Sequence, residues 1–329
     1  MKLWMWAIAA TTALVATDAA REVPRDELPA DYGQVLPQGL WPKEAPAYDA
    51  AKVQLGRALY FDPLLSIDQQ TSCASCHDPA KGFGDGRRLS VGSGGTTERH
   101  SPSLFNRGLG SSFAWDGRHA TLSAQMLFPI SSPIEMGLPL PVAVERLRAN
   151  DKYAGQFQRV YGRPADAEAL GDALAAFVVR ITSGDSRVER FQGGDFAALS
   201  DLERTGLWIY ESKGRCWRCH AGANFTDESL RVTGVGAREG VAREGRAAVT
   251  RETSDRGRFK VPTLRGVAHH PPYMHDGSLE SLDAVVEYYD RGGERVPGDE
   301  RAPGNELEPL HLTAHERAAL VAFLKALSP

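Results

Sequence analysis

Hydrophobic residues recur along the chain with the spacing of amphipathic helices and seldom with the alternation of strands. In the segment SLDAVVEYYDRGG, residues 281–293, one helix face collects Leu282, Val285, Val286 and Tyr289 before a glycine pair ends the helix. The same pattern predicts helices over residues 48–60, 120–128, 140–150, 165–182, 198–211, 279–290 and 313–327. Irregular loops are expected over 84–100, 232–258 and 292–309. The chain is therefore predicted to be all-α and loop-rich.

Two adjacent tyrosines close the 279–290 helix. Tyr288 and Tyr289 point roughly 100° apart, so only one of them can share the buried face. The periodicity places Tyr289 on that face and Tyr288 on the helix surface. A buried phenol needs a partner for its oxygen, so the helix must face something that Tyr289 can bind.

The N-terminus carries a lysine, a short apolar run and then small residues, in the sequence MKLWMWAIAATTALVATDAA. This arrangement is typical of a secretory signal peptide over residues 1–20. The run is shorter than the roughly 20 apolar residues of a membrane span. A proline-rich stretch, 24–46, follows as an extended arm. We therefore expect a secreted protein without a membrane span.

Length and charge limit the classes of function. A chain of 329 residues is long enough for two domains. A net charge of -4 offers no basic surface, which argues against nucleic acid as a partner.

All four cysteines belong to two copies of one motif, CASCH (Cys73, Cys76, His77) and CWRCH (Cys216, Cys219, His220). In c-type haem attachment the two thiols bind the porphyrin and the histidine binds iron. A thioredoxin-like redox pair or a four-cysteine zinc site would need only the cysteines. The histidine after each pair therefore favours two covalent haems.

A shift of 160 residues reveals an internal repeat. It aligns SPSL at 101–104 with VPTL at 261–264, Trp115-Asp116-Gly117 with His275-Asp276-Gly277, and Leu122 with Leu282. Each half has a haem motif, a Pro-x-Leu step, an Asp-Gly turn and a helix in the same order. The sequence therefore predicts two tandem cytochrome c-like domains, residues 21–195 and 196–329.

The repeat places Pro129 opposite Tyr289. Proline has no atom that can bind iron, whereas tyrosine offers a phenolate oxygen. If both helices cover a haem, the first haem keeps an open sixth position and the second is closed. Met274 is the rival ligand, because a thioether is the usual sixth ligand of electron-transfer cytochromes.

An open haem that cleaves peroxide needs a group to move a proton and polar contacts for the developing charge. Gln125 and Glu135 follow the first Asp-Gly turn and could serve, although a lone loop glutamate is often only solvated. The ring of Trp115 either shortens an electron hop between two cofactors or packs the core.

At these residues the chain resembles the bacterial di-haem cytochrome c peroxidases, and within them the MauG-type enzymes. The resemblance runs from about Leu55 to the C-terminus. It rests on LGRALYFDPLLS, SCASCHDPAKGFGD, SPSLFN, FAWDGR, PIEMG, CWRCH, GRFKVPTLR and PYMHDG in order.

The family resemblance implies roles for individual residues. The first haem, on His77, would be peroxidatic, the second, on His220, would store an oxidising equivalent, and Trp115 would lie between them. Gln125 and Glu135 fall on the family's distal glutamine and glutamate. Tyr289 and Pro129 stand where MauG-type enzymes have the second haem's tyrosine ligand and a proline above the open haem. Those enzymes use peroxide to reach high-valent haem states and oxidise tryptophans in a partner protein.

Three departures from the family pattern change the expectations. Ser93 replaces the distal histidine of peroxidases that need reductive activation, so we expect no activation step. Gly214 replaces the tryptophan that MauG-type enzymes use for radical transfer, and Trp208, Tyr210 and Trp217 are the nearby aromatic residues. His100 and His270 replace residues of the family's calcium site, which argues against calcium between the domains.

The sequence thus predicts a periplasmic peroxidase that reduces hydrogen peroxide at the first haem with electrons from a protein donor. The donor is either a small cytochrome, as in ordinary cytochrome c peroxidases, or a substrate protein with oxidisable Trp or Tyr, as in the MauG branch. The competing class is a non-catalytic di-haem electron carrier, which would have two closed haems. Whether the chain forms a homodimer is left open.

Overall fold

The computed structural model describes residues 49–236, 244–294 and 307–328. Within these ranges the α-helices are α1 (Ala50–Phe61), α2 (Leu122–Ser131), α3 (Leu140–Ala149), α4 (Asp151–Tyr161), α5 (Ala167–Val179), α6 (Arg187–Gln192), α7 (Asp201–Glu211), α8 (Ala247–Thr250), α9 (Leu282–Asp290) and α10 (Ala314–Ala326). Two antiparallel ladders join β1 (Val91–Gly92) to β2 (Gly95–Thr96) and β3 (Leu230–Val232) to β4 (Arg258–Lys260). The fold is mostly helical and loop-rich, as predicted.

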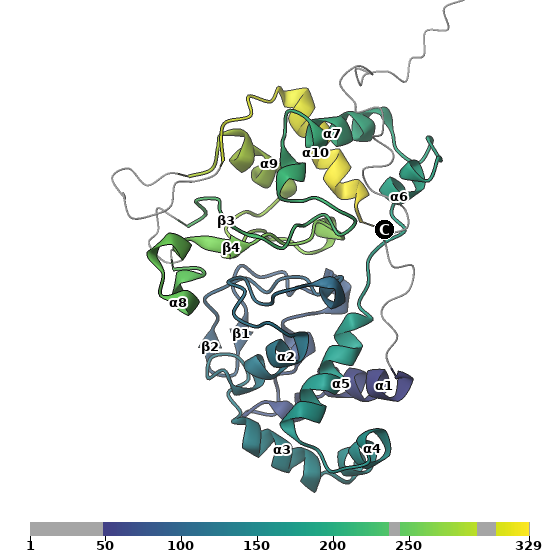
Figure 1. Cartoon of the computed structure of the whole chain (residues 1–329), viewed down its shortest axis with the longest axis vertical. Helices are drawn as coiled ribbons and strands as arrows, with labels where there is room; N and C mark the ends of the chain where they lie inside the picture. The colour runs from purple at the N-terminus through teal and green to yellow at the C-terminus, as the bar shows by residue number, and fades with distance from the viewer. Residues whose placement is uncertain (1–48, 237–243, 295–306, 329) are drawn as a thin grey trace, which may run out of the picture.

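The helices form two halves stacked along the long axis of the molecule (Figure 1). In the N-terminal half, α1 crosses α5 over a core that extends in sequence from Leu55 to Ile181. In the C-terminal half, α7 crosses α10 over a core that extends from Val188 to Leu327. The domain division at residue 195 stays a prediction, and the packing of Val188 favours a boundary a few residues earlier.

A glycine lies at the contact point of each of the two main helix crossings. A Cβ atom on Gly56 of α1 would lie 1.8 Å from the carbonyl oxygen of Ala173, and one on Gly206 of α7 would lie 2.0 Å from that of Ala319. Any larger residue would force the two helices apart. The two halves therefore use the same device to bring a pair of helices into backbone contact.

The 160-residue repeat is confirmed in three dimensions. Features that coincide under this shift are the 3-10 helices Arg107–Leu109 and Val267–His269, the β-bridges Phe113–His119 and Tyr273–Leu279, and the first residues of α2 and α9. Each of those two helices begins at a hydroxyl cap, in which Thr121 or Ser281 accepts a hydrogen bond from the N–H three residues later. The repeat therefore preserves local geometry as well as sequence order.

The helix prediction was incomplete between residues 149 and 195. Asn150 accepts a hydrogen bond from the N–H of Tyr153 (3.3 Å) and so caps a new helix, α4. The hydrophobic pattern predicts only that the preceding helix ends here. The six-residue α6 is too short to show a periodicity. The predicted loop 84–100 contains the β1–β2 hairpin, and the helix predicted over 120–128 continues through Pro129 to Ser131.

Several predictions fall outside the described residues. These are the signal peptide 1–20, the proline-rich stretch 24–46, and residues 237–243 and 295–306 of two predicted loops. None of the described helices has both the length and the apolar character that a membrane crossing requires.

Candidate functional site

One cavity of about 950 Å³ lies between the halves and reaches both cysteine motifs. Every predicted site residue lines it, namely Cys73, Cys76, His77, Trp115, Gln125, Pro129, Glu135, Cys216, Cys219, His220 and Tyr289. These residues come from α2 and α9, the turn before α2 that carries Trp115, the loop after α2 that carries Glu135, and the two Cys-x-x-Cys-His motifs. Tertiary structure thus brings together groups that are up to 216 positions apart in the sequence, from Cys73 to Tyr289.

The two motif histidines are held in the same way. The Nδ1 atom of His77 lies 3.0 Å from the carbonyl oxygen of Phe83, and that of His220 lies 3.1 Å from the carbonyl oxygen of Phe225. A carbonyl can only accept, so Nδ1 carries the proton and Nε2 keeps its lone pair for a metal. Burial lowers the pKa of both histidines, which keeps the rings neutral. Both are therefore suited to bind haem iron.

The four cysteines form no disulfide. Burial raises the pKa of Cys73 and of Cys216 to about 12. A reactive redox pair needs a thiol whose pKa is lowered, and neither of these thiols is of that kind. Among the described residues, no group of three or more His, Cys, Asp or Glu side chains is placed to hold a metal ion. Thioether attachment of haem fits these residues better than either alternative.

Pro129 lies in the last turns of α2 and lines the cavity. Because proline has no N–H, the carbonyl of Gln125 one turn earlier has no helical donor. The side chain of Gln125 also faces the cavity, and its Oε1 atom is buried without a hydrogen-bond partner among the described residues. A buried amide oxygen of this kind is suited to a ligand that donates a hydrogen bond.

Glu135 is fixed by backbone contacts on two sides. The loop folds back on α2 through the N–H of Met136, which donates to the carbonyl of Pro129 (3.1 Å). From the other side, the N–H of Ser93 in the β1–β2 hairpin donates to the carbonyl of Glu135 (2.6 Å). A Cβ atom on Gly92 would lie 2.4 Å from that carbonyl oxygen, and one on Gly94 would lie 1.9 Å from the carbonyl oxygen of Pro133. The hairpin can approach this closely because it carries glycine at both positions.

Burial raises the pKa of Glu135, and the nearby cation of Arg118 partly opposes the shift. Arg118 is itself held by Asp116, with Nε 2.9 Å from one carboxylate oxygen. A carboxyl group whose pKa is raised toward neutrality is a better acid and base near pH 7 than an ordinary glutamate.

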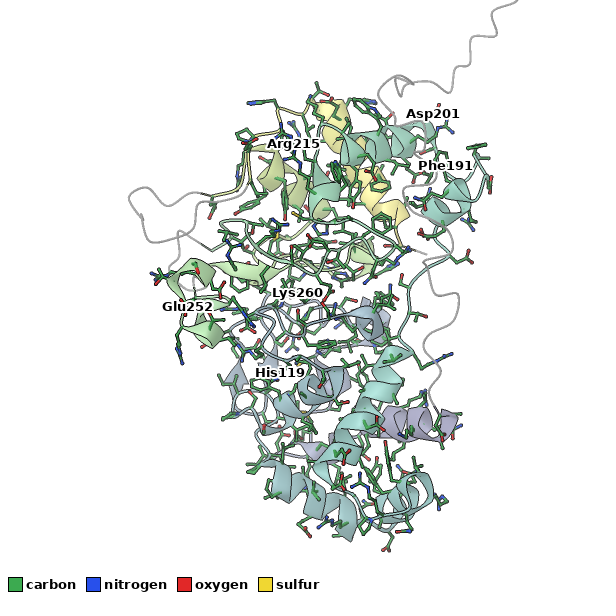
Figure 2. All side chains as sticks on the ribbon, viewed as in Figure 1. His119, Phe191, Asp201, Arg215, Glu252 and Lys260 are labelled. Carbon is green, nitrogen blue, oxygen red and sulfur yellow. The ribbon has the colours of Figure 1, made fainter. Side chains whose placement is uncertain are left out.

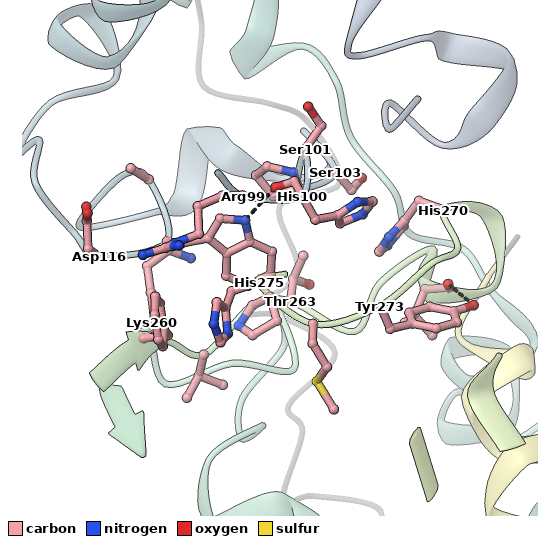
Figure 3. A pocket seen from close by; sticks show the side chains of 18 of the residues that line it. Arg99, His100, Ser101, Ser103, Asp116, Lys260, Thr263, His270, Tyr273 and His275 are labelled. Carbon is pink, nitrogen blue, oxygen red and sulfur yellow. Dashed lines mark hydrogen bonds between the residues drawn. The ribbon is translucent and has the colours of Figure 1, made fainter. Parts of the chain in front are cut away.

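Trp115 lies where the two halves meet. Its indole Nε1 donates to the carbonyl of His100 (2.7 Å), and its own carbonyl accepts from the N–H of Lys260 in the C-terminal half (2.7 Å). Its ring meets that of His275 edge to face at 6.4 Å, and His275 stacks on Phe259 at 3.6 Å. Figure 3 shows His100, Lys260 and His275 around this point. The contacts tie Trp115 to both halves.

A buried ion pair at the junction was missed by the sequence analysis. Arg107 donates to the carboxylate of Glu228 (2.7 Å), and Lys260 lies 3.6 Å from it. Figure 2 shows Lys260 between the halves. Burial lowers the pKa of Lys260 to about 8. Arg107 and Glu228 are 121 residues apart, so no local spacing could have paired them.

The prediction for Tyr288 was wrong. Its side chain is only 2% exposed, and its hydroxyl donates to the carbonyl of Thr233 (2.8 Å) and accepts from the N–H of Glu294 (3.2 Å). The chain next to β3 covers the helix face that periodicity alone assigned to solvent. Tyr289 instead lines the cavity, where burial raises its pKa and the sulfurs of Cys216 and Cys219 are near.

The structure also shows what surrounds the residues that depart from the family pattern. Ser93 Oγ donates to the hydroxyl of Thr71 (3.0 Å), close to the first haem motif. A Cβ atom on Gly214 would lie 2.7 Å from the carbonyl oxygen of Ile209, so a tryptophan would not fit this backbone. His100 and His270 line the cavity with buried Nε2 atoms that have no partner in the described part of the chain (Figure 3).

In the one cavity, one Cys-x-x-Cys-His motif is accompanied by a carboxyl, an amide and a proline, and the other by a phenol. Comparison with known proteins identifies the class. The di-haem cytochrome c peroxidase family matches residues 50–197. The methylamine utilization protein MauG of Methylorubrum extorquens is 36% identical over 98% of this chain and 91% of its own length. Cytochrome-c peroxidase IdrP2 of Denitromonas iodatirespirans is 33% identical over 87% of this chain and 83% of its own.

The crystal structure of a MauG-like protein associated with microbial copper homeostasis superimposes with a TM-score of 0.76 at 32% identity, covering 87% of this chain and 91% of that one. The chain therefore belongs to the di-haem cytochrome c peroxidase family. It is an enzyme of the peroxide-dependent oxidoreductase class, and its two cysteine pairs are consistent with two c-type haems.

Proposed function

We propose that the protein is a periplasmic enzyme that reduces hydrogen peroxide at the N-terminal haem site with electrons from a protein donor that reach the C-terminal site. The proposal rests on one observation. A single cavity joins two equivalent haem motifs, yet the matching helix positions that line it carry Pro129 in one half and Tyr289 in the other. With haem bound, the first site would stay accessible and the second would be closed, which suits catalysis at the first and electron storage at the second.

When bound, the haems supply the redox chemistry of peroxide reduction and hold the oxidising equivalents. His77 and His220 would bind the two irons, and the four cysteines would hold the porphyrins. Glu135 would take a proton from one peroxide oxygen and return it to the other, which helps the O–O bond break. Gln125 would orient the peroxide through its buried amide oxygen, which accepts a hydrogen bond from it.

Trp115 would couple the two sites electronically, because it forms hydrogen bonds to both halves and lines the cavity between them. Tyr289 would close the second site as an anionic oxygen ligand. Such a ligand stabilises ferric and higher iron and makes a simple electron carrier a less suitable interpretation.

The first site is expected to work without prior reduction. In peroxidases that need reductive activation, the loop after the first haem motif carries a histidine. Here this loop is the β1–β2 hairpin, whose Ser93 and glycines hold the backbone of Glu135. We also propose that no calcium is required, because His100 and His270 offer imidazole nitrogens where calcium prefers oxygen.

An EPR spectrum of the diferric protein tests the proposal. We expect one high-spin signal from the open site and one low-spin signal from the closed site. Two low-spin signals without a high-spin signal would contradict the enzyme mechanism and support the carrier.

Peroxide added to the diferric protein without a donor then distinguishes the two enzyme types. A long-lived near-infrared charge-resonance band would support the MauG-like form. Its absence, together with fast oxidation of a reduced small cytochrome, would support an ordinary cytochrome c peroxidase, as the similarity to IdrP2 allows.

A further inference from the structure

The two halves meet through a reciprocal pair of backbone hydrogen bonds. The N–H of His100 donates to the carbonyl of His275 (2.9 Å), and the N–H of Lys260 donates to the carbonyl of Trp115 (2.7 Å). Residues 100 and 260 are 160 positions apart, as are residues 115 and 275, so the internal repeat relates one bond to the other. The junction is therefore built from equivalent positions of the two halves, in the manner of a twofold interface.

The side chains at this junction differ between the halves. Position 99 is arginine, whereas the equivalent position 259 is phenylalanine. The guanidinium of Arg99 lies over the ring of Phe259, 5.2 Å from its centre, and the ring of His275 stacks on the same phenylalanine at 3.6 Å. All three side chains line the cavity that joins the cysteine motifs, and Figure 3 shows Arg99 and His275 there. A cation and an imidazole are thus held on one aromatic ring in the cavity wall.

The charge of Arg99 has no counter-ion in the described part of the chain. Its Nη1 atom donates to the carbonyl of Glu98 (3.1 Å), but the guanidinium forms no ion pair with any residue that the structure describes. Burial lowers its pKa, which means that the charged form lacks the stabilisation that water would give. Arg107 and Arg118 line the same cavity, and each of them pairs with a carboxylate. Arg99 therefore differs from its neighbours in needing an anion.

His275 has an unused polar atom at the same place. Its side chain is only 4% exposed, and its Nε2 atom is buried without a hydrogen-bond partner among the described residues. Burial lowers the pKa of His275, so the ring is neutral and can donate one N–H. A cation and a neutral donor side by side are suited to a carboxylate. The other charged groups around these two side chains are Glu98, Asp116, Arg118 and Asp276.

We propose that Arg99 and His275 bind a haem propionate where the two halves meet, with Arg99 as its counter-ion and the Nε2–H of His275 as a second donor. This inference rests on the haem attachment that is part of the proposed function. The propionates are the anionic groups of haem, and a buried carboxylate is stable only when it is paired and hydrogen-bonded. Arg99 keeps this propionate ionised near neutral pH, so its charge stays constant when the haem changes oxidation state.

Redox titration of the holoprotein at several pH values around neutrality tests the site. In Arg99→Gln the buried propionate loses its counter-ion, so its pKa should rise. At the lower pH values it is protonated, and the haem potential should match that of the native protein. At the higher values it carries an uncompensated negative charge, which stabilises ferric haem and should lower the potential below the native one. A potential with the native pH dependence would overturn the inference.

Two further variants separate the charge of Arg99 from its packing. Arg99→Lys keeps a cation and should restore the native pH dependence of the potential, whereas a dependence like that of Arg99→Gln would overturn the role of charge. Arg159→Gln removes an exposed arginine of α4 and is the matched control. It should leave the potential unchanged at every pH, and an equal effect in this variant would contradict a local site.

Resonance Raman spectroscopy provides a second measurement that does not depend on the folding of Arg99→Gln. The propionate bending band should shift in Arg99→Lys, because an ammonium group cannot reproduce the forked hydrogen bonds of a guanidinium. It should shift less in His275→Gln, which keeps an N–H donor, than in His275→Leu, which removes it. Bands that are identical to the native ones in all three variants would overturn the site.

The inference and the function beneath it fail in different ways. Variants that bind both haems and retain native potentials and bands would overturn only the propionate site. Native protein that lacks covalent haem at either motif, or that carries both haems and does not consume peroxide, would instead contradict the proposed function.

Discussion

The N-terminal and C-terminal halves have the same backbone features but different side chains at the cavity. Both have a glycine-closed helix crossing, a haem motif on a 3-10 helix, a histidine fixed through Nδ1, and a capped helix over the cavity. At the matching position of that last helix, one half carries Pro129 and the other Tyr289. The difference supports the proposal that a common scaffold acquires two roles through a few side chains in the cavity, without a change of fold.

The largest expected effect concerns Glu135, the proposed acid and base, which belongs to the first half only. Glu135→Gln keeps the size of the side chain but cannot move a proton, so the rate of peroxide reduction should fall by about 10²–10⁴-fold. Stopped-flow mixing of the diferric variant with peroxide measures this rate. A rate near that of the native protein would remove Glu135 from the mechanism.

The pH dependence of the same variant sharpens the assignment. Because burial raises the pKa of Glu135, the native rate should decline as pH falls through a value above the ordinary range for glutamate. Glu135→Gln should lack this decline. The raised pKa also means that the charged carboxyl costs folding free energy above that value and nothing below the pKa of the unfolded chain. The variant should therefore gain stability relative to the native protein only at the higher pH values.

The second change tests the contrast between proline and tyrosine directly. Tyr289→Met replaces an anionic oxygen ligand with a neutral thioether, which favours ferrous iron. The potential of the second haem should rise on the order of 100 mV, within the roughly 0.8 V range that axial ligands set. Redox titration measures the shift, and an unchanged potential would show that Tyr289 is not the ligand.

The third change tests whether the hairpin positions the catalytic loop. Gly94→Ala places a methyl group against the carbonyl of Pro133, and overpacking of this kind costs about 1–3 kcal/mol. We expect a lower free energy of unfolding, slower peroxide reduction and an unchanged potential at the second haem. Gly84→Ala is the control, because its Cβ would meet nothing closer than 3.4 Å. Equal behaviour of the two variants would argue against the hairpin's role.

The smallest effect is expected at the neighbouring tyrosine. Tyr288→Phe removes the hydrogen bonds to Thr233 and Glu294 and should cost about 1 kcal/mol of unfolding free energy. Chemical denaturation measures this loss. The EPR spectrum should not change, since the hydroxyl of Tyr288 faces β3 and not the haem site, and a spectral change would mean that the two tyrosines exchange roles.

Much of the site could be predicted because the residues that carry its chemistry form recognisable local patterns in the sequence. The cysteines and histidine of each motif are adjacent in sequence, and the 160-residue repeat aligns Pro129 with Tyr289 without any knowledge of the fold. Capped helices such as α10 also follow from short-range rules, as the hydrogen bond between Thr313 and the N–H of Glu316 shows. These features need only neighbours along the chain.

Other features depend on contacts between distant segments. Helix periodicity predicted that Tyr288 is exposed, because it contains no information about the chain beside β3 that covers this ring. The β1–β2 hairpin that pins Glu135 depends on a contact between residues about 40 positions apart. The ion pair between Arg107 and Glu228 depends on one 121 positions apart. Nothing near these residues in the sequence specifies such partners.

The sequence by itself therefore determined that the chain has two haem motifs, two repeated halves and an asymmetric pair of covering residues. It could do so because covalent haem attachment and helix periodicity are local. Only the tertiary structure decided that both motifs share one cavity, that Trp115 is hydrogen-bonded to both halves, and that Trp217 is exposed. Those facts depend on how two cores pack against each other, and packing is a property of the whole chain.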